Sequence, residues 1–279
     1  MLEAREIMNL ETKAVKEFWN EESCGERYLS VDSTKGISYK EEMRQRYELE
    51  PYLKTFAKFD NLRGLDVLEI GVGLGSDHST IALAEPSTLT GIDLTKRAID
   101  HTKKRFKEMG LSSKLNIGNA ENMSFEDKSF DFVYSWGVLH HSPNTRKCFD
   151  EIYRVLRPGG KAKIMIYHKY SCVGLMLWLR YGLFSLKPFM TLTELYANHL
   201  ESPGTKAYTI KEANNIASKF SKVESSVELS FGDLLIGDVG KRHRGQVLTL
   251  AKTIYPRRVI KLISKIFPIG LYILMTVEK

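Results

Sequence analysis

The stretch Asp66-Val67-Leu68-Glu69-Ile70-Gly71-Val72-Gly73-Leu74-Gly75 decides how this chain folds. It reads as a short buried strand that ends near an acidic residue and continues directly into three closely spaced glycines. Parallel strands buried on both faces are near-continuous apolar runs, and ligands of open α/β sheets bind beyond their carboxyl ends. Glycine lets the backbone turn sharply there and approach a ligand closely. The stretch therefore predicts a turn that binds a nucleoside cofactor.

The details of this turn argue against NAD as the ligand. Its spacing is G-x-G-x-G, and Ser76 stands where a dinucleotide fingerprint would place its third glycine. Glu69 would repel a pyrophosphate, but it suits a cationic ligand such as a sulfonium or an ammonium group. The alternative is an ordinary strand-to-helix turn that binds nothing.

Strands and helices alternate after the glycine turn. The pattern predicts helices over 76–84, 95–109, 142–156 and 210–220, and strands over 88–92, 114–117, 130–135, 161–167, 223–229 and 271–277. Asp93 follows the glycines by about twenty residues, where alternating α/β proteins hold ribose hydroxyls. We therefore expect an α/β fold with a doubly wound, mostly parallel, seven-stranded Rossmann-like sheet.

The chain is predicted to divide into four segments. These are a helical N-terminal cap or lid (1–60), a cofactor-binding core (61–168), an apolar helical insertion (169–207), and a C-terminal completion of the sheet (208–279) with a basic insertion at 232–268. Glycines, a proline and charged residues interrupt the apolar insertion, so a membrane-spanning helix is not expected there.

Composition indicates a soluble globular protein, because 43% of the 279 residues are hydrophobic and 27% are charged. A charged, helix-prone segment follows Met1, so no signal peptide is expected. Cys24, Cys148 and Cys172 are scattered, which favours reduced thiols in a cytoplasmic protein and neither disulfides nor a metal site. The helical spacing around Cys148 predicts a core residue.

The positive charge of the chain is concentrated late in the sequence. Between Val239 and Val277 there is no acidic residue but there are eight Lys or Arg. The part between Pro256 and Pro268 predicts an amphipathic helix with a broad apolar face and four basic residues. We expect it to bind an anionic group, either on the substrate or on a membrane surface through residues 256–268. The alternative is that its apolar face packs on the sheet.

Several motifs together resemble a known family. They are Val67 to Gly75, Gly91-Ile92-Asp93-Leu94, Asn119-Ala120-Glu121, Phe130 to Ser135, Leu139-His140-His141 and Arg154 to Gly160. In this order and spacing, over residues 62–168, they resemble class I S-adenosylmethionine-dependent methyltransferases of the small-molecule group that includes ubiquinone and menaquinone biosynthesis enzymes. Residues 1–50 and 232–268 fall outside the resemblance.

The resemblance implies S-adenosylmethionine as cofactor and a role for each matching residue. Glu69 and the backbone of Gly71, Gly73 and Gly75 would cradle the methionine end of the cofactor. Asp93 would bind the ribose, Leu94 would pack on the adenine, and Asn119 and Ala120 would contact the adenine edge. Ser135 and Trp136 would line the wall under the sulfonium. The family more often has Asp at the position of Asn119, whose amide oxygen can still accept a hydrogen bond.

The expected reaction is in-line methyl transfer to a small-molecule acceptor that is anionic or lipid-like. Most of the rate of such a transfer comes from positioning the two reacting atoms. His141 and His168 are the candidate general bases, and residues 1–50 and 171–200 are expected to roof the acceptor. No nucleic-acid partner is expected, because the chain lacks the Asn/Asp-Pro-Pro-aromatic cluster of base-methylating enzymes. Two alternatives are an aminopropyl transferase and a catalytically silent S-adenosylmethionine-binding protein that acts as a sensor or partner.

Overall fold

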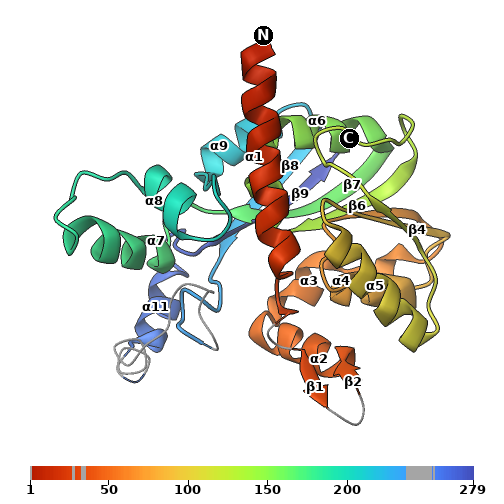
Figure 1. The fold of residues 1–279 in the computed structure, drawn as a ribbon, viewed down its shortest axis with the longest axis horizontal. Coiled ribbons are helices and arrows are strands. Elements are labelled where there is room, and N and C mark those ends of the chain that lie inside the picture. The colour runs from red at the N-terminus through yellow and green to blue at the C-terminus, as the bar shows by residue number, and fades with distance from the viewer. Residues whose placement is uncertain (1, 27–28, 33–35, 237–252, 254) are drawn as a thin grey trace.

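A computed structural model describes residues 2–26, 29–32, 36–236, 253 and 255–279 (Figure 1). Its centre is a seven-stranded sheet with the order β5-β4-β3-β6-β7-β9-β8. The strands are β3 (Asp66–Ile70), β4 (Thr88–Asp93), β5 (Lys114–Ile117), β6 (Phe130–Trp136), β7 (Leu156–Tyr167), β8 (Lys222–Glu228) and β9 (Tyr272–Glu278). β3 to β7 pair in parallel, and β9 runs antiparallel to both β7 and β8. The predicted fold class is confirmed.

Helices cover both faces of this sheet (Figure 1). The described helical elements are α1 (Leu2–Glu21), α2 (Tyr39–Leu49), α3 (Tyr52–Ala57), η2 (Phe59–Leu62), α4 (Ser76–Leu83), α5 (Lys96–Met109), η3 (Leu139–His141), α6 (Thr145–Val155), α7 (Cys172–Leu177), η4 (Trp178–Leu183), α8 (Leu192–His199), α9 (Ile210–Ile216) and α11 (Arg257–Ile263). A small separate hairpin joins β1 (Ser30–Asp32) and β2 (Gly36–Ser38).

Two hydrophobic cores lie on opposite faces of the sheet. One joins α6 and α9 to the central strands, and Cys148, Phe149 and Ile152 of α6 are fully buried in it. The other joins α3, η2, α4 and α5, with Leu53 and Ile81 fully buried. Both cores form because the strands carry apolar side chains on both faces, as in other parallel sheets. Cys148 is a core residue, as its spacing predicted.

Several helix ends follow from local capping residues. Thr95 caps α5 by accepting a hydrogen bond from the Ala98 backbone, and Gly110 ends this helix in the left-handed conformation (φ 66°). Four expected bounds were wrong. α6 begins at Thr145 instead of residue 142, and the helix expected between Pro256 and Pro268 ends at Ile263. β7 begins at Leu156 instead of Lys161, and α9 ends at Ile216 instead of Phe220. The α6 helix thus passes into β7 without an intervening loop.

The apolar segment 171–200 forms α7, η4 and α8 beside the sheet. Its buried residues Val173, Leu177 and Leu195 pack against β7 and β9 and form a third core. None of the described helices is long and apolar enough to cross a membrane. Part of the basic insertion, residues 237–252 and 254, lies outside the described residues.

Candidate active site

A cavity of about 260 Å³ opens at the carboxyl ends of β3, β4, β6 and β7. It collects nine of the twelve site residues that the sequence predicted: Glu69, Gly71, Gly73, Asp93, Leu94, Asn119, Ala120, Trp136 and His141. Carboxyl ends of parallel strands meet at one edge of the sheet, so residues that follow different strands converge there. Gly75, Ser135 and His168 are not among the lining residues.

The glycine turn has the backbone that its sequence predicted. Gly71 has a φ of 84°, and a Cβ there would lie 2.1 Å from a methyl carbon of Val138. Gly75 has a φ of 78° and would place a Cβ 2.9 Å from Thr102. Gly75 therefore shapes the turn into α4 without facing the cavity. A Cβ on Gly73 would meet nothing within 4 Å, so the backbone there stays accessible from the cavity.

Asp93 ends β4 and presents its carboxylate to the cavity. One oxygen accepts hydrogen bonds from the Thr95 backbone (2.9 Å) and hydroxyl (2.8 Å), and the other accepts from the Gly73 backbone at 3.2 Å. A carboxylate has about four acceptor positions, so the second oxygen can still accept from ribose hydroxyls. Burial raises the pKa of Asp93, whereas the bonds from Thr95 and Gly73 lower it. The residues present therefore fit the nucleoside of S-adenosylmethionine.

Glu69 has a partner that the sequence did not indicate. Its carboxylate is buried and lies 2.8 Å from Nδ1 of His78, on the next helix. Burial raises the pKa of Glu69, and the negative charges of Asp77 and Asp93 raise it further. Burial also lowers the pKa of His78 to about 3. Glu69 lines the cavity, and its contact with the methionine end stays a prediction.

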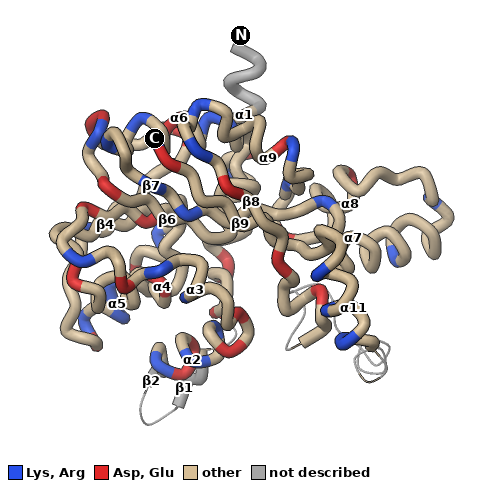
Figure 2. The backbone as a smooth tube through the Cα atoms, turned by 180° about the vertical axis from the view of Figure 1, so that it is seen from behind, with Lys and Arg blue, Asp and Glu red and all other residues tan. Residues whose placement is uncertain are grey.

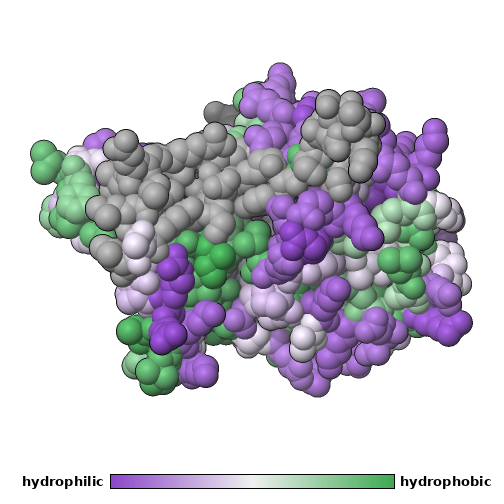
Figure 3. All heavy atoms as spheres, turned by 90° about the horizontal axis from the view of Figure 1, so that it is seen from below, coloured by the Kyte–Doolittle hydropathy of each residue, from purple (hydrophilic) through white to green (hydrophobic). Residues whose placement is uncertain are grey.

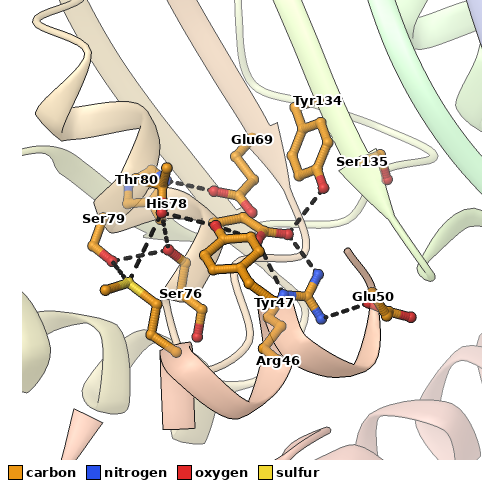
Figure 4. Close-up of polar contacts among 12 residues, drawn as sticks. Arg46, Tyr47, Glu50, Glu69, Ser76, His78, Ser79, Thr80, Tyr134 and Ser135 are labelled. Carbon is orange, nitrogen blue, oxygen red and sulfur yellow. Dashed lines mark hydrogen bonds and ion pairs between the residues drawn. The ribbon is translucent and has the colours of Figure 1, made fainter. Parts of the chain in front are cut away.

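A buried polar network that sequence reasoning missed closes the cavity beside Glu69. Asp77 of α4 accepts two hydrogen bonds from Arg46 of α2, at 3.0 and 2.6 Å. It also accepts from the hydroxyls of Tyr47 (3.0 Å) and Tyr134 (2.9 Å). Figure 4 shows Arg46 and Tyr47 of α2 and Tyr134 of β6 pointing toward one another. No local signal could have found this network, because its partners lie 30 to 57 residues from Asp77.

Two further predicted residues have structural partners. The Ser135 hydroxyl is buried and donates to the Ile70 carbonyl at 3.2 Å, so this side chain ties β6 to β3. Asn119 lines the cavity, and its amide oxygen accepts from the Glu121 backbone at 2.9 Å. A second lone pair of that oxygen remains for an adenine amino group.

The other end of the cavity is aromatic. Trp19, Trp136, Tyr167, Phe231 and Tyr272 line it. Trp19 comes from α1, and its ring lies 5.2 Å from the ring of His141. Residues 1–50 therefore line this end of the cavity, and their role as a roof over the acceptor stays a prediction. The described lining includes nothing from 171–200. Val173, Leu177 and Leu195 of that segment pack beside β7 and β9, whereas its large apolar residues Phe184, Leu186 and Phe189 are exposed.

His141 belongs to a polar group at this aromatic end. Its Nδ1 lies 2.8 Å from the Ser202 hydroxyl, and its Nε2 lies 3.4 Å from Glu201. The Tyr167 hydroxyl donates to the same Glu201 oxygen at 2.7 Å. Glu201 was not predicted from the sequence. It follows α8, far from every recognised motif.

His168 does not join this group. Its Nδ1 lies 3.0 Å from the Gly270 carbonyl, and its ring is buried at the end of β7 outside the cavity. Because a carbonyl only accepts hydrogen bonds, Nδ1 of His168 carries a proton. The bond connects the end of β7 to the residues that precede β9. The structure therefore brings one of the two candidate bases, His141, to the cavity.

His140 lies next to His141, and both of its ring nitrogens are buried without a hydrogen-bond partner among the described residues. Ligand atoms of His140, His141 and Glu201 lie within 4.8 Å of one another. Burial lowers the pKa of His140 well below its ordinary value. Its imidazole is therefore neutral, and it stacks on Tyr167 with ring centroids 3.8 Å apart.

Carboxyl groups outnumber cations in the cavity lining. The six are Glu42, Glu50, Glu69, Asp77, Asp93 and Glu201, and Glu42 is paired with the buried Arg105. Arg46 is the one Lys or Arg among the described lining residues, and it already pairs with Asp77 and, at 3.4 Å, with Glu50. Burial raises the pKa of Glu50, although the charge of Arg46 lowers it. The site therefore suits cationic ligands and disfavours anions.

Comparison with known families agrees with this geometry. A family model described as a methyltransferase domain matches residues 68–164. The match spans β3 to β7 and includes the glycine turn, Asp93 and His141. Residues 68–164 are a methyltransferase domain. Its cofactor is S-adenosylmethionine, and the resemblance seen in the sequence motifs is confirmed.

Curated relatives share this domain. Phosphoethanolamine N-methyltransferase 2 of Caenorhabditis elegans is 37% identical over 119 residues, which cover 42% of this chain and 27% of that protein. Fatty-acid O-methyltransferase of Mycolicibacterium smegmatis is 37% identical over 116 residues, covering 41% of each chain. The chain thus matches less than half the length of these two relatives.

A solved structure extends the likeness to most of the fold. A Haemonchus contortus phosphoethanolamine N-methyltransferase 2, in complex with phosphomonomethylethanolamine and S-adenosylhomocysteine, has a TM-score of 0.53 and 20% identity. It covers 83% of this chain and 51% of that chain. The likeness in fold therefore extends well beyond residues 68–164.

Proposed function

We propose that this protein transfers a methyl group from S-adenosylmethionine to a small, lipid-like acceptor with a neutral hydroxyl or an amine at its reacting end. The observation that carries the proposal is one continuous cavity. It joins Asp93 and the glycine turn to an aromatic compartment around Trp136 and Tyr167. When bound, the cofactor supplies an electrophilic methyl group on a sulfonium.

The residues of the chain have three tasks in this proposal. Asp93, with the backbone at Gly73, holds the nucleoside, and the acidic lining favours the positive charge of the sulfonium. The aromatic walls from Trp136 and Tyr272 exclude water and hold the apolar body of the acceptor. Positioning of this kind supplies most of the rate in methyl transfer, because the two reacting atoms only need an in-line approach.

Glu201 and His141 are the proposed bases. An acceptor hydroxyl must lose its proton as the new bond to the methyl carbon forms. Glu201 accepts from the Tyr167 hydroxyl at 2.7 Å and lies 3.4 Å from His141 Nε2, so either group can receive that proton beside the aromatic walls. The Ser202 hydroxyl, 2.8 Å from Nδ1, orients the imidazole.

The charge of the lining supports the acceptor class. Fatty acid and phosphoethanolamine, the acceptors in the names of two relatives, both carry an anionic group. Arg46 is already held by two carboxylates, so it does not balance a further anion. We therefore propose that the anionic group expected from the sequence binds outside this cavity.

The proposal is tested with compounds that carry the same single alkyl chain and differ in the reacting group at its end. The measurement is the release of S-adenosylhomocysteine. We expect turnover with a primary alcohol or amine, and little with a carboxylate or with phosphoethanolamine. Glu201→Gln should lower kcat for the alcohol by about 10²-fold or more and leave cofactor affinity unchanged. The exposed Glu224→Gln is the matched control.

Two outcomes would contradict the proposal. Turnover confined to the anionic compounds would exclude a neutral or amine acceptor. Tight binding of the cofactor with no release from any compound would favour the catalytically silent binding protein.

A further inference from the structure

The short helix α11 is attached to the rest of the protein by one narrow side. Arg257, Ile260 and Ser264 are half-buried, and their spacing of three and four residues places them on a single helix side. The Arg257 guanidinium donates to the carbonyls of Leu234 (2.8 Å) and Leu235 (3.1 Å). None of the residues of α11 is buried. Among the described residues, the side-chain hydrogen bonds that attach α11 to the turn after β8 come from this side.

The remaining surface of α11 and of the turn that follows it, residues 264–267, combines apolar and basic side chains. Val259, Leu262, Ile266 and Phe267 expose 53 to 70% of their area. Arg258, Lys261 and Lys265 are also exposed and lie beside the apolar row, since residues three and four apart share a face. We call these seven residues the α11 patch. Its apolar row does not pack on the sheet.

Both properties of the patch are visible on the molecular surface. Figure 2 shows Lys and Arg along α11, and Figure 3 shows hydrophobic atoms gathered in the part of the molecule where Figure 1 places α7 and α11. Contiguous exposed apolar side chains of this kind mark an interaction surface. Their exposure is unfavourable in water, so a partner that covers them would stabilise the protein.

We propose that the α11 patch docks this protein on an anionic membrane, with the apolar row inserted at the boundary between headgroups and acyl chains. Apolar and basic rows side by side are the features of helices that lie in this region. A small soluble anion would use the cations and leave the apolar row exposed. A second copy of the chain would bring two sets of like charges together, which is unfavourable.

Residues 230–235 connect the α11 patch to the methyltransferase cavity. Phe231 lines the aromatic end of the cavity, and the Leu234 and Leu235 carbonyls accept hydrogen bonds from Arg257. Asp233 lies between them and accepts hydrogen bonds from the backbones of Val173 and Leu271 at 3.1 and 2.7 Å. A protein docked through the patch would therefore hold its acceptor compartment close to the bilayer.

Sedimentation with vesicles tests the docking without any need for methyl transfer. The full-length protein should pellet with phosphatidylcholine vesicles that contain phosphatidylglycerol at low salt, and much less at high salt or with phosphatidylcholine alone. Lys261→Glu with Lys265→Glu should lower the partition coefficient by at least about 30-fold, since each lost basic residue near an anionic leaflet contributes roughly fivefold and the anionic leaflet repels the two new acidic residues. Leu262→Asp with Ile266→Asp should lower it by at least about tenfold.

Matched control variants distinguish docking through the α11 patch from a general attraction of the positively charged protein to anionic vesicles. Lys103→Glu with Lys104→Glu changes the net charge equally on exposed positions of α5, and Leu83→Asp with Ile117→Asp places acids at positions that are 58 and 54% exposed elsewhere. Both control pairs should pellet as the parent protein does, and circular dichroism should show that all variants are folded.

Three results would overturn the proposal. The first is no pelleting of the parent protein with anionic vesicles at low salt. The second is an equal loss of binding in the α11 and α5 charge pairs. The third is a lipid-free dimer, seen by sedimentation velocity, that Leu262→Asp with Ile266→Asp dissociates, because the patch would then be an interface between copies.

Discussion

Two helices outside the sheet, α2 and α11, are attached to the protein in opposite ways. Buried ion pairs hold α2, with Arg46 bonded to Asp77 and Glu42 bonded to the fully buried Arg105. By contrast, α11 is held by one arginine on two backbone carbonyls and exposes its apolar row. The first arrangement fixes a wall of the cavity in one geometry. The second leaves a surface available for a partner.

The α2 attachment gives the largest expected effect. Asp77→Ala would leave the Arg46 charge and two tyrosine hydroxyls without their shared partner, in a region where Asp77 is only 5% exposed. Removal of one member of a buried ion pair costs about 3–5 kcal/mol. We expect a loss of this size in the free energy of unfolding, measured with urea.

A surface ion pair provides the control. Lys96 and Asp100 are paired on α5 with both side chains more than half exposed, so Asp100→Ala should cost less than about 1 kcal/mol. Similar losses for the two variants would show that α2 is not fixed by its buried charges.

The sequence predicted the fold and the glycine-turn end of the cavity because their signals are local. The glycine turn, the cap at Thr95 and the position of Asp93 each depend on neighbours in the chain. The contacts at the aromatic end, where we propose that the acceptor binds, join distant segments. Glu201 meets His141 and Tyr167 across 60 and 34 residues, and Arg46 meets Asp77 across 31.

Amphipathic pattern alone also did not decide which side of α11 faces the protein. Its apolar residues predicted either a packed face or a membrane surface. The structure places Arg257, Ile260 and Ser264 inward instead, because the arginine donates hydrogen bonds to the carbonyls of Leu234 and Leu235 in the turn that follows β8. Such a choice depends on hydrogen-bond partners far away in the sequence.

The next largest effect concerns cofactor binding. Asp93→Ala should weaken the binding of S-adenosylhomocysteine by about 1–3 kcal/mol, the cost of leaving polar partners unpaired. Calorimetry can measure this, with Asp100→Ala as control because that carboxylate is exposed on α5. Unchanged affinity in Asp93→Ala would remove Asp93 from the site.

Cofactor affinity should also depend on pH, with a smaller effect. The carboxylate form of Asp93 accepts hydrogen bonds from ribose hydroxyls, and burial raises its pKa. Affinity should therefore be full at neutral pH and fall as the pH drops through a pKa above that of an ordinary aspartate. Glu69 lies in the same cavity, and burial raises its pKa as well.

Asp93→Asn separates these two carboxyls, because the amide does not titrate. Calorimetry across mildly acidic pH should show a flatter dependence in this variant than in the parent protein. Identical pH profiles would assign the dependence to Glu69 or another group.

The smallest effect is chemical and compares the thiols of the cavity and the core. Cys24 is exposed and lines the cavity, whereas Cys148 is fully buried in α6. Burial raises the pKa of Cys148 to about 12, so its reactive thiolate is scarce at neutral pH. Mass spectrometry after brief treatment with iodoacetamide should show alkylation of Cys24 and none of Cys148. S-adenosylhomocysteine should slow the reaction of Cys24 if the ligand occupies the cavity, and an equal rate with and without it would place the ligand away from the α1–α2 side.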